Sequence, residues 1–117
     1  LAIANLASKF YPQELIFLYE GWFEETVSQI EPDQKFAFIH LDCDLYSSTL
    51  TVLHHLFEGD HFADGCVLLL DDFLCNRGSK AFGMRRAWLD CVAKYQPELT
   101  DLGLFGTSSW CFIVHRD

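Results

Sequence analysis

The stretches FIHLDCDLYSST at residues 38–49 and GCVLLLDDF at residues 65–73 decide the fold of this chain. Each is a short apolar run that ends in a pair of aspartates, as expected for strands buried on both faces of a parallel sheet. The four residues are Asp42, Asp44, Asp71 and Asp72. Because ligands of open α/β sheets bind beyond the carboxyl ends of the strands, we expect the functional site at this edge.

Further apolar runs predict the rest of an α/β sheet. Central strands are predicted at residues 14–19, 36–41 and 66–70. The segments between them carry apolar residues at helical spacing, which predicts crossover helices, and a similar stripe predicts a third helix at residues 79–95.

The end of the chain predicts an antiparallel hairpin. Residues 99–106 and 109–115 are strand-like runs, and their connection around Gly106 and Thr107 is too short for a crossover helix. We therefore expect residues 1–117 to form a single domain whose sheet has parallel strands and one antiparallel strand at its edge.

Composition narrows the classes of partner. The chain has 117 residues and a formal net charge of -9, which disfavours binding to nucleic acid or anionic lipid. The longest apolar run, residues 66–70, is far shorter than the roughly 20 residues of a membrane span. Five cysteines without zinc-ligand spacing indicate reduced, mostly buried thiols. We expect a soluble, cytoplasmic protein, with a homo-oligomer as an open alternative.

The aspartate pairs predict a metal site. Carboxylates at the ends of adjacent parallel strands repel one another unless they are protonated or bridged by a cation, and oxygen ligands favour Mg²⁺ or a similar divalent ion. The competing interpretation is that an aspartate after a strand forms a turn or caps a helix. Asp44 is the candidate for such a cap, on a helix that begins near Ser47.

The two stretches, together with LYEGWFEETV upstream and the paired Arg85 and Arg86 downstream, resemble the macrocin O-methyltransferase (TylF-like) family. That family has an LD-x-D-LY-x-ST motif after one strand and DD[YF] after the next. The resemblance covers nearly all of the chain beyond about Glu14.

The resemblance implies a Rossmann-like class I methyltransferase fold that uses S-adenosylmethionine. It implies Mg²⁺ held by Asp42, Asp71 and Asp72, and methyl transfer to a hydroxyl of a sugar or other small metabolite. Asp42 or Asp44 would be the catalytic base. By resemblance, Gly21 and Trp22 lie near the adenosine of the cofactor, although a tryptophan that opens an amphipathic helix more often packs in a core.

One departure from the family is substantial. No G-x-G motif with an acidic partner on the next strand precedes Glu14, so the strands that carry the cofactor loop are missing. We therefore expect the C-terminal portion of a methyltransferase domain, as a fragment or a truncated chain.

Two rival interpretations stay open. A D-x-D motif after a strand also occurs in haloacid-dehalogenase-type phosphatases, but these need a lysine between their acidic motifs, and no lysine lies between Lys35 and Lys80. The second rival is a non-catalytic, methyltransferase-like module. His54 and His55 point to different faces of a predicted helix, which argues against a shared metal, and His40 and His115 are interpreted as satisfied or exposed imidazoles rather than catalysts.

Overall fold

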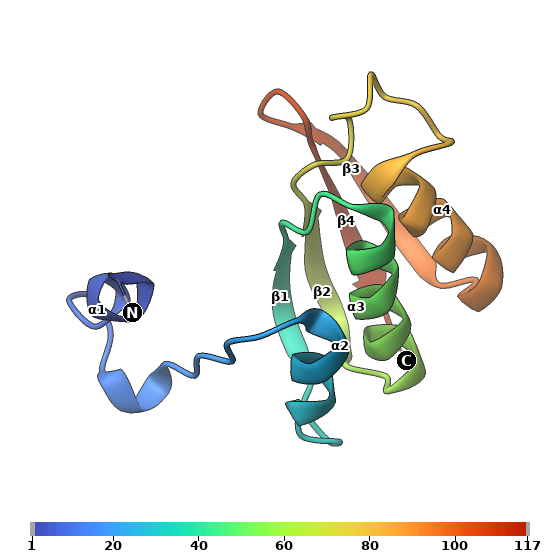
Figure 1. The fold of residues 1–117 in the computed structure, drawn as a ribbon. Helices are drawn as coiled ribbons and strands as arrows, with labels where there is room; N and C mark the ends of the chain where they lie inside the picture. The colour runs from blue at the N-terminus through green and yellow to red at the C-terminus, as the bar shows by residue number, and fades with distance from the viewer. Residues whose placement is uncertain (1, 117) are drawn as a thin grey trace.

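The computed structural model describes residues 2–116 and, for residues 2–4, the backbone alone. A four-stranded mixed sheet of order β1-β2-β4-β3 forms its centre (Figure 1). The elements in chain order are α1 (Ala2–Ala7), η1 (Gln13–Leu15), α2 (Phe23–Thr26), η2 (Val27–Gln29), β1 (Phe36–Leu41), α3 (Tyr46–Glu58), β2 (Phe62–Leu70), α4 (Gly83–Tyr95), β3 (Glu98–Phe105) and β4 (Ser109–His115). The predicted α/β class is confirmed.

The predicted strands at residues 36–41 and 66–70 are confirmed as β1 and the second half of β2, which pair in parallel. The antiparallel hairpin of β3 and β4 is also confirmed. The prediction that the antiparallel strand lies at the edge of the sheet was wrong. The antiparallel strand is β4, which lies between β2 and β3 and pairs with both, so that β3 forms the edge. A helix about 10 Å wide covers roughly two strands spaced about 4.8 Å apart, so the α4 crossover leaves room for one strand between β2 and β3.

The predicted strand at residues 14–19 was wrong. Residues 13–15 form η1, and residues 16–20 are extended without a regular partner. This part of the chain runs away from the sheet (Figure 1), and its apolar side chains stay in solvent, as shown by Phe17 at 74 % exposure. A strand requires a neighbour for its backbone hydrogen bonds, which an apolar run alone does not supply.

The predicted helices are confirmed in place but differ in extent. The segment after Gly21 forms two short pieces, α2 and η2, rather than one long helix. The last helix begins at Gly83 instead of residue 79, because residues 71–78 and 80–82 form successive turns and a bend. These turns hold the chain that follows the second aspartate pair close to the sheet edge.

The core lies between one face of the sheet and the helices α3 and α4 (Figure 1). Fully buried side chains from both layers meet there, among them Leu53, Leu68, Met84 and Val114. Among the cysteines, which are all free, only Cys66 and Cys91 are buried, so the prediction of mostly buried thiols was wrong.

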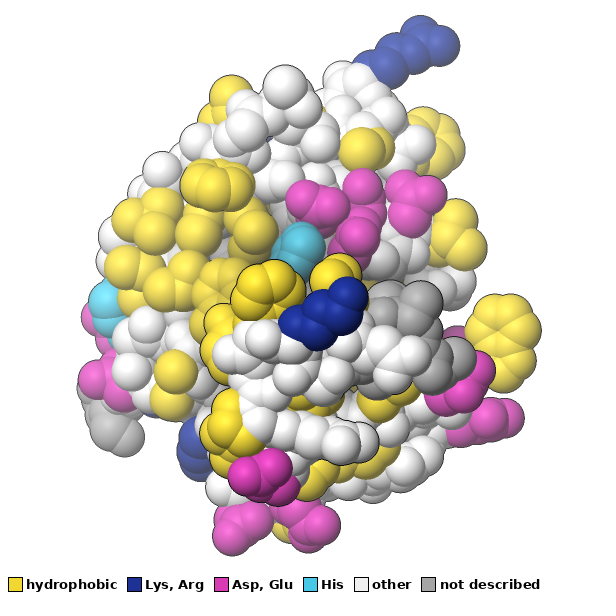
Figure 2. Space-filling model, turned by 90° about the vertical axis from the view of Figure 1, so that its left-hand side faces the viewer, with side chains coloured by type: hydrophobic (Ala, Val, Ile, Leu, Met, Phe, Trp, Pro, Cys, Tyr) yellow, Lys and Arg dark blue, Asp and Glu magenta, His cyan; other side chains and the backbone are white. Residues whose placement is uncertain are grey.

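The other face of the sheet is not covered by any helix of residues 2–116. Its side chains, Phe38, Val67, Leu69, Cys111 and Ile113, are exposed or half-buried. From the α1 and β1 side, Figure 2 shows hydrophobic side chains gathered beside a histidine and a group of acidic side chains. None of the helices described has the length and apolar character needed to span a bilayer.

We expect Leu68→Ala to lower the free energy of unfolding by about 2–5 kcal/mol, because it removes a fully buried side chain at the centre of the core. Leu102→Ala is the matched control, since Leu102 is 53 % exposed and its loss should change this free energy by less than about 0.5 kcal/mol. Urea unfolding followed by circular dichroism measures both, and equal effects would contradict this core.

A stacked histidine pair predicts a pH dependence. The rings of His55 and His61 lie 5.1 Å apart, and His55 Nε2 is buried without a hydrogen-bond partner. Burial, followed by the charge of His61, lowers the pKa of His55 below its usual value. As pH falls below about 6.5, the unfolded chain protonates His55 before the folded chain does, so stability decreases until the folded pKa is passed.

We expect His55→Phe, which keeps a stacking ring, to reduce the loss of unfolding free energy between pH 7 and pH 5. Urea unfolding at both pH values measures the unfolding free energy of the variant and of wild type. Because the two proteins share their other histidines, the contribution of those residues cancels when the two pH-dependent losses are compared. The same decrease in both proteins would rule out His55 as its source.

Candidate metal centre

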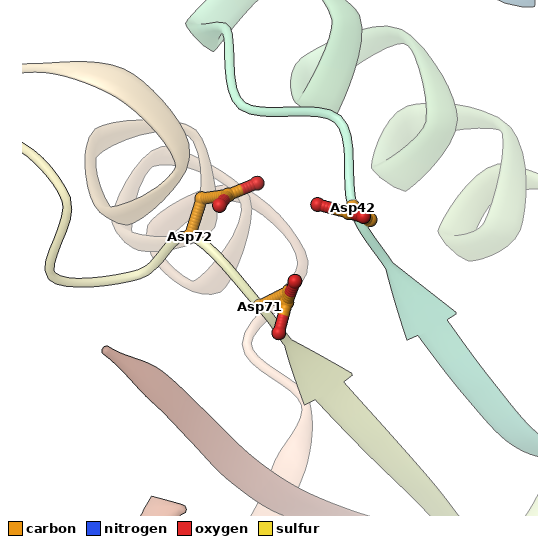
Figure 3. A group of neighbouring side chains, drawn as sticks. All are labelled: Asp42, Asp71 and Asp72. Carbon is orange, nitrogen blue, oxygen red and sulfur yellow. The ribbon is translucent and has the colours of Figure 1, made fainter. Parts of the chain in front are cut away.

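Three aspartates meet at the carboxyl ends of β1 and β2. The parallel register sets Leu41 opposite Leu70, and the Asp71 backbone N–H donates to the Leu41 carbonyl at 2.9 Å. Asp42 and Asp71 therefore leave the sheet side by side. One carboxylate oxygen from each of Asp42, Asp71 and Asp72 lies within 4.8 Å of the others, and Figure 3 shows the three side chains converging from the two strand ends.

The three carboxyl groups are not electrostatically equivalent. The pKa of Asp42 is raised, because Asp72 accepts a hydrogen bond from its protonated form and repels its ionised form. The pKa of Asp71 is lowered, above all because the Ser109 hydroxyl donates to Asp71 Oδ1 at 2.8 Å. Asp72 Oδ2 is buried and has no hydrogen-bond partner among the described residues.

This arrangement fits a divalent cation. A buried carboxylate oxygen without a partner is costly, and a positive charge at the cluster would satisfy it while relieving the repulsion that raises the pKa of Asp42. A small set of carboxylate oxygens suits Mg²⁺, which binds through one or two carboxylates and keeps waters for exchange with a substrate. The aspartates that the sequence grouped are thus brought together, and metal binding itself stays a prediction.

Two residues beside the cluster were not assigned to it from the sequence. Ser109, at the start of β4, also donates to the Asp71 carbonyl at 3.0 Å and is 7 % exposed. No local pattern links Ser109 to an aspartate 38 positions earlier. His40, interpreted as a satisfied or exposed imidazole, is half exposed on β1 with Nε2 3.6 Å from Asp71 Oδ1.

Asp44 lies outside the three-aspartate cluster. It is exposed and has a φ of 61°, so it turns the chain between β1 and α3. The predicted helix cap was wrong, because Leu45 occupies the N-cap position of α3 and makes no side-chain capping bond. The left-handed conformation at Asp44, which aspartate tolerates better than most residues, replaces a cap as the reason for its position. A role for Asp44 as a base stays a prediction.

The thiol between the first two aspartates is not a nucleophile. Burial raises the pKa of Cys43 to about 11, with the charge of Asp42 as a smaller cause. The thiol therefore stays protonated at neutral pH, and the chemistry of this edge rests on oxygen groups.

Gly21 and Trp22 stand before α2 and lie outside the cluster. Trp22 is 77 % exposed at the N-cap position of α2, so the alternative of core packing was wrong. Their neighbours Tyr19 and Phe23 line a cavity of about 370 Å³ that also reaches His40 and Asp42. The remaining lining residues are Thr26, Val27, Ile30, Leu41, Cys43 and Val52. A mostly apolar cavity thus adjoins the carboxylates.

Comparison with known proteins gives one match. The sequence model of a family described as macrocin-O-methyltransferase (TylF) matches residues 11–90. This range is more than half of the chain and includes the three clustered aspartates as well as Gly21 and Trp22. No curated protein and no solved structure matches the chain.

The cluster predicts a metal-dependent stability. At a Mg²⁺ concentration about 100 times the dissociation constant, wild type should gain about 2.7 kcal/mol of unfolding free energy. Asp72→Asn should weaken Mg²⁺ binding at least about tenfold, because it removes a ligand charge, and should therefore lose at least about half of this gain. Without metal, the variant should be no less stable than wild type, because Asp72→Asn removes one of three carboxylates that repel one another.

Asp44→Asn is the control for this prediction, because asparagine keeps the left-handed backbone and Asp44 lies outside the cluster. It should retain the Mg²⁺-dependent gain in urea unfolding and the heat of binding in calorimetry. Equal loss in both variants would contradict the assignment of ligands.

Proposed function

The chain belongs to the macrocin-O-methyltransferase (TylF) family, and from this membership we propose that it transfers a methyl group from S-adenosylmethionine to a hydroxyl of a sugar or other small metabolite, assisted by Mg²⁺. The observation that carries the proposal is the convergence of Asp42, Asp71 and Asp72 at two adjacent strand ends within the matched range. The phosphatase alternative lacks such support, since the match points to a methyltransferase.

Each clustered aspartate has a distinct part in the proposal. Asp71, fixed by Ser109 and kept ionised by its lowered pKa, is suited to hold a cation permanently. Asp72 directs a buried oxygen without a partner toward the same place. Asp42 is the most exposed of the three, so its carboxylate is the one that an incoming hydroxyl group meets first.

When bound, a divalent ion lowers the pKa of a substrate hydroxyl, and S-adenosylmethionine supplies an electrophilic methyl group. The cofactor would supply this methyl group to the hydroxyl oxygen, and the hydroxyl proton would pass to a carboxylate oxygen of this chain. Asp42 and Asp44 are the candidate acceptors of this proton. Asp42 belongs to the ligand set, whereas Asp44 stays outside it.

The cavity beside α2 supports a place for the cofactor. It joins the apolar side chains of Tyr19 and Phe23 to Asp42, so a ligand seated there would reach the carboxylates. The exposed ring of Trp22 is free to stack on an adenine, and Gly21, with a φ of 140°, allows a close backbone approach. We propose these two residues as cofactor contacts.

We further propose that the chain is the C-terminal portion of a methyltransferase domain. The uncovered sheet face, with Phe38 at 58 % exposure, and the exposed apolar side chains of residues 6–22 support additional covering structure. The acceptor should be a small molecule rather than nucleic acid, because the net charge of -9 opposes phosphate. The free cysteines fit a cytoplasmic location.

Titration with S-adenosylhomocysteine, with and without Mg²⁺, tests the proposal by calorimetry and tryptophan fluorescence. We expect saturable binding with a change in Trp22 emission, and Trp22→Phe should abolish the fluorescence change while retaining the heat. With a small polyol acceptor and S-adenosylmethionine, Asp71→Asn should reduce methyl transfer at least about tenfold.

The matched control for Asp71→Asn is Asp33→Asn, an exposed aspartate in the turn before β1 and outside the cluster. Absence of binding to protein that circular dichroism shows to be folded would favour the non-catalytic module. Binding that is saturable but indifferent to Mg²⁺ and to Asp71 would remove the metal from the proposal.

A further inference from the structure

A second cavity, of about 340 Å³, lies between α4 and the β3–β4 hairpin. The rings of Trp88 and Phe112, 4.7 Å apart between centroids, are buried at its floor, and Trp110, 5.6 Å from the buried Phe73 ring, is the half-buried aromatic ring of its wall. The remaining lining residues are Arg85, Leu89, Val92, Leu99 and Asp101. Its volume is at the lower end of small-molecule sites, which suits a ligand of one or two fused rings.

Arg85 brings the positive charge to this cavity. Its guanidinium carbon lies 5.2 Å from the centre of the Phe73 ring, and one terminal nitrogen donates to the Gly78 carbonyl at 2.7 Å. Its Nε is buried and has no hydrogen-bond partner among the described residues. Unlike its neighbour Arg86, which lies 3.9 Å from Asp90, Arg85 forms none of the ion pairs found in residues 2–116.

Lys9, Arg77 and Lys80 likewise form none of the ion pairs found in residues 2–116, but of these four basic residues Arg85 alone has a buried nitrogen without a hydrogen-bond partner there. Asp101, the only acidic residue in the lining, does not pair with Arg85. Instead, Asp101 Oδ1 accepts hydrogen bonds from Trp110 Nε1 at 2.7 Å and from the Gly103 N–H at 2.8 Å. This carboxylate therefore orients the Trp110 ring, and the charge of Arg85 is left for a group from outside the described chain.

We propose that this cavity binds a planar aromatic anion, whose rings lie against Trp110, Leu89 and Leu99 and whose carboxylate pairs with Arg85. Aromatic walls favour stacked or edge-on rings, and a guanidinium fork matches the two oxygens of a carboxylate. The site is separate from the aspartate cluster, which would repel such a ligand. The proposal does not depend on the methyltransferase function and fails or succeeds independently of it.

The test uses 2-naphthoate as the probe and 2-naphthamide as its neutral counterpart of similar shape. Calorimetry should show one saturable site for 2-naphthoate, at least about tenfold tighter than for the amide, because a charged hydrogen bond is stronger than a neutral one. In nitrogen–proton correlation spectra, the indole signals of Trp88 and Trp110 should shift. Trp22, which is exposed before α2, is the internal control and should not shift.

Arg85→Gln should weaken 2-naphthoate at least about tenfold while changing 2-naphthamide little, since it removes the charge and keeps a donor. Arg86→Gln is the matched control, because Arg86 lies 4.2 Å from the Tyr46 ring centre and beside Asp90 rather than in the cavity. It should bind 2-naphthoate as wild type does. Near-ultraviolet circular dichroism checks that both variants are folded.

Leu99→Trp provides a second test if Arg85→Gln does not fold. Its larger side chain should fill the cavity and abolish binding of both probes. The proposal is overturned if 2-naphthoate binds no more tightly than the amide, if Arg86→Gln weakens it as much as Arg85→Gln, or if no saturable binding occurs. A shift of Trp22 in place of Trp88 and Trp110 would also overturn it.

Discussion

The parallel pairing of β1 with β2 is the constraint on which the site depends. The register that sets Leu41 opposite Leu70 ends both strands at the same level, and the bond from the Asp71 N–H to the Leu41 carbonyl extends the pairing by one residue. A shift of one residue would turn alternate side chains to the opposite face and separate Asp42 from Asp71. Burial of Leu68 and Leu70 beneath α3 and α4 opposes such a shift, so the core fixes the geometry of the carboxylates.

The part of the fold that could be predicted follows from local sequence patterns, namely apolar runs and a short turn. The apolar runs that end in Asp42 and Asp71 form strands as predicted, but the prediction that they are buried on both faces was wrong, because among the described residues only one face is covered. Their strand ends follow from the position of the aspartates alone. The hairpin was also predictable, because the turn at Gly106 and Thr107 leaves no room for a helix. Since adjacent parallel strands end together, the spacing predicted that all four aspartates lie close together, and this was wrong for Asp44; the choice of Asp42, Asp71 and Asp72 came from the family resemblance.

The parts that could not be predicted depend on distant partners. Residues 14–19 have the composition of a strand, but strand formation requires a neighbouring backbone, which this run lacks among the described residues. β4 lies inside the sheet because the crossover through α4 places β3 one strand position away from β2, and β4 pairs in the space between them. That same insertion brings Ser109 to Asp71, so the error about the sheet edge and the failure to assign Ser109 have one cause.

Each of the two proposed binding sites, the aspartate cluster and the cavity beside α4, contains a buried polar atom without a hydrogen-bond partner among the described residues. Asp72 Oδ2 and Arg85 Nε carry opposite charges, both lack a hydrogen bond, and they lie thirteen positions apart on one stretch of chain. They form none of the ion pairs found in residues 2–116, and Phe73, the residue after Asp72, lies under the Arg85 guanidinium. In the two proposals made above, a cation at the aspartates and an anion in the second cavity would each supply a partner to one of these atoms.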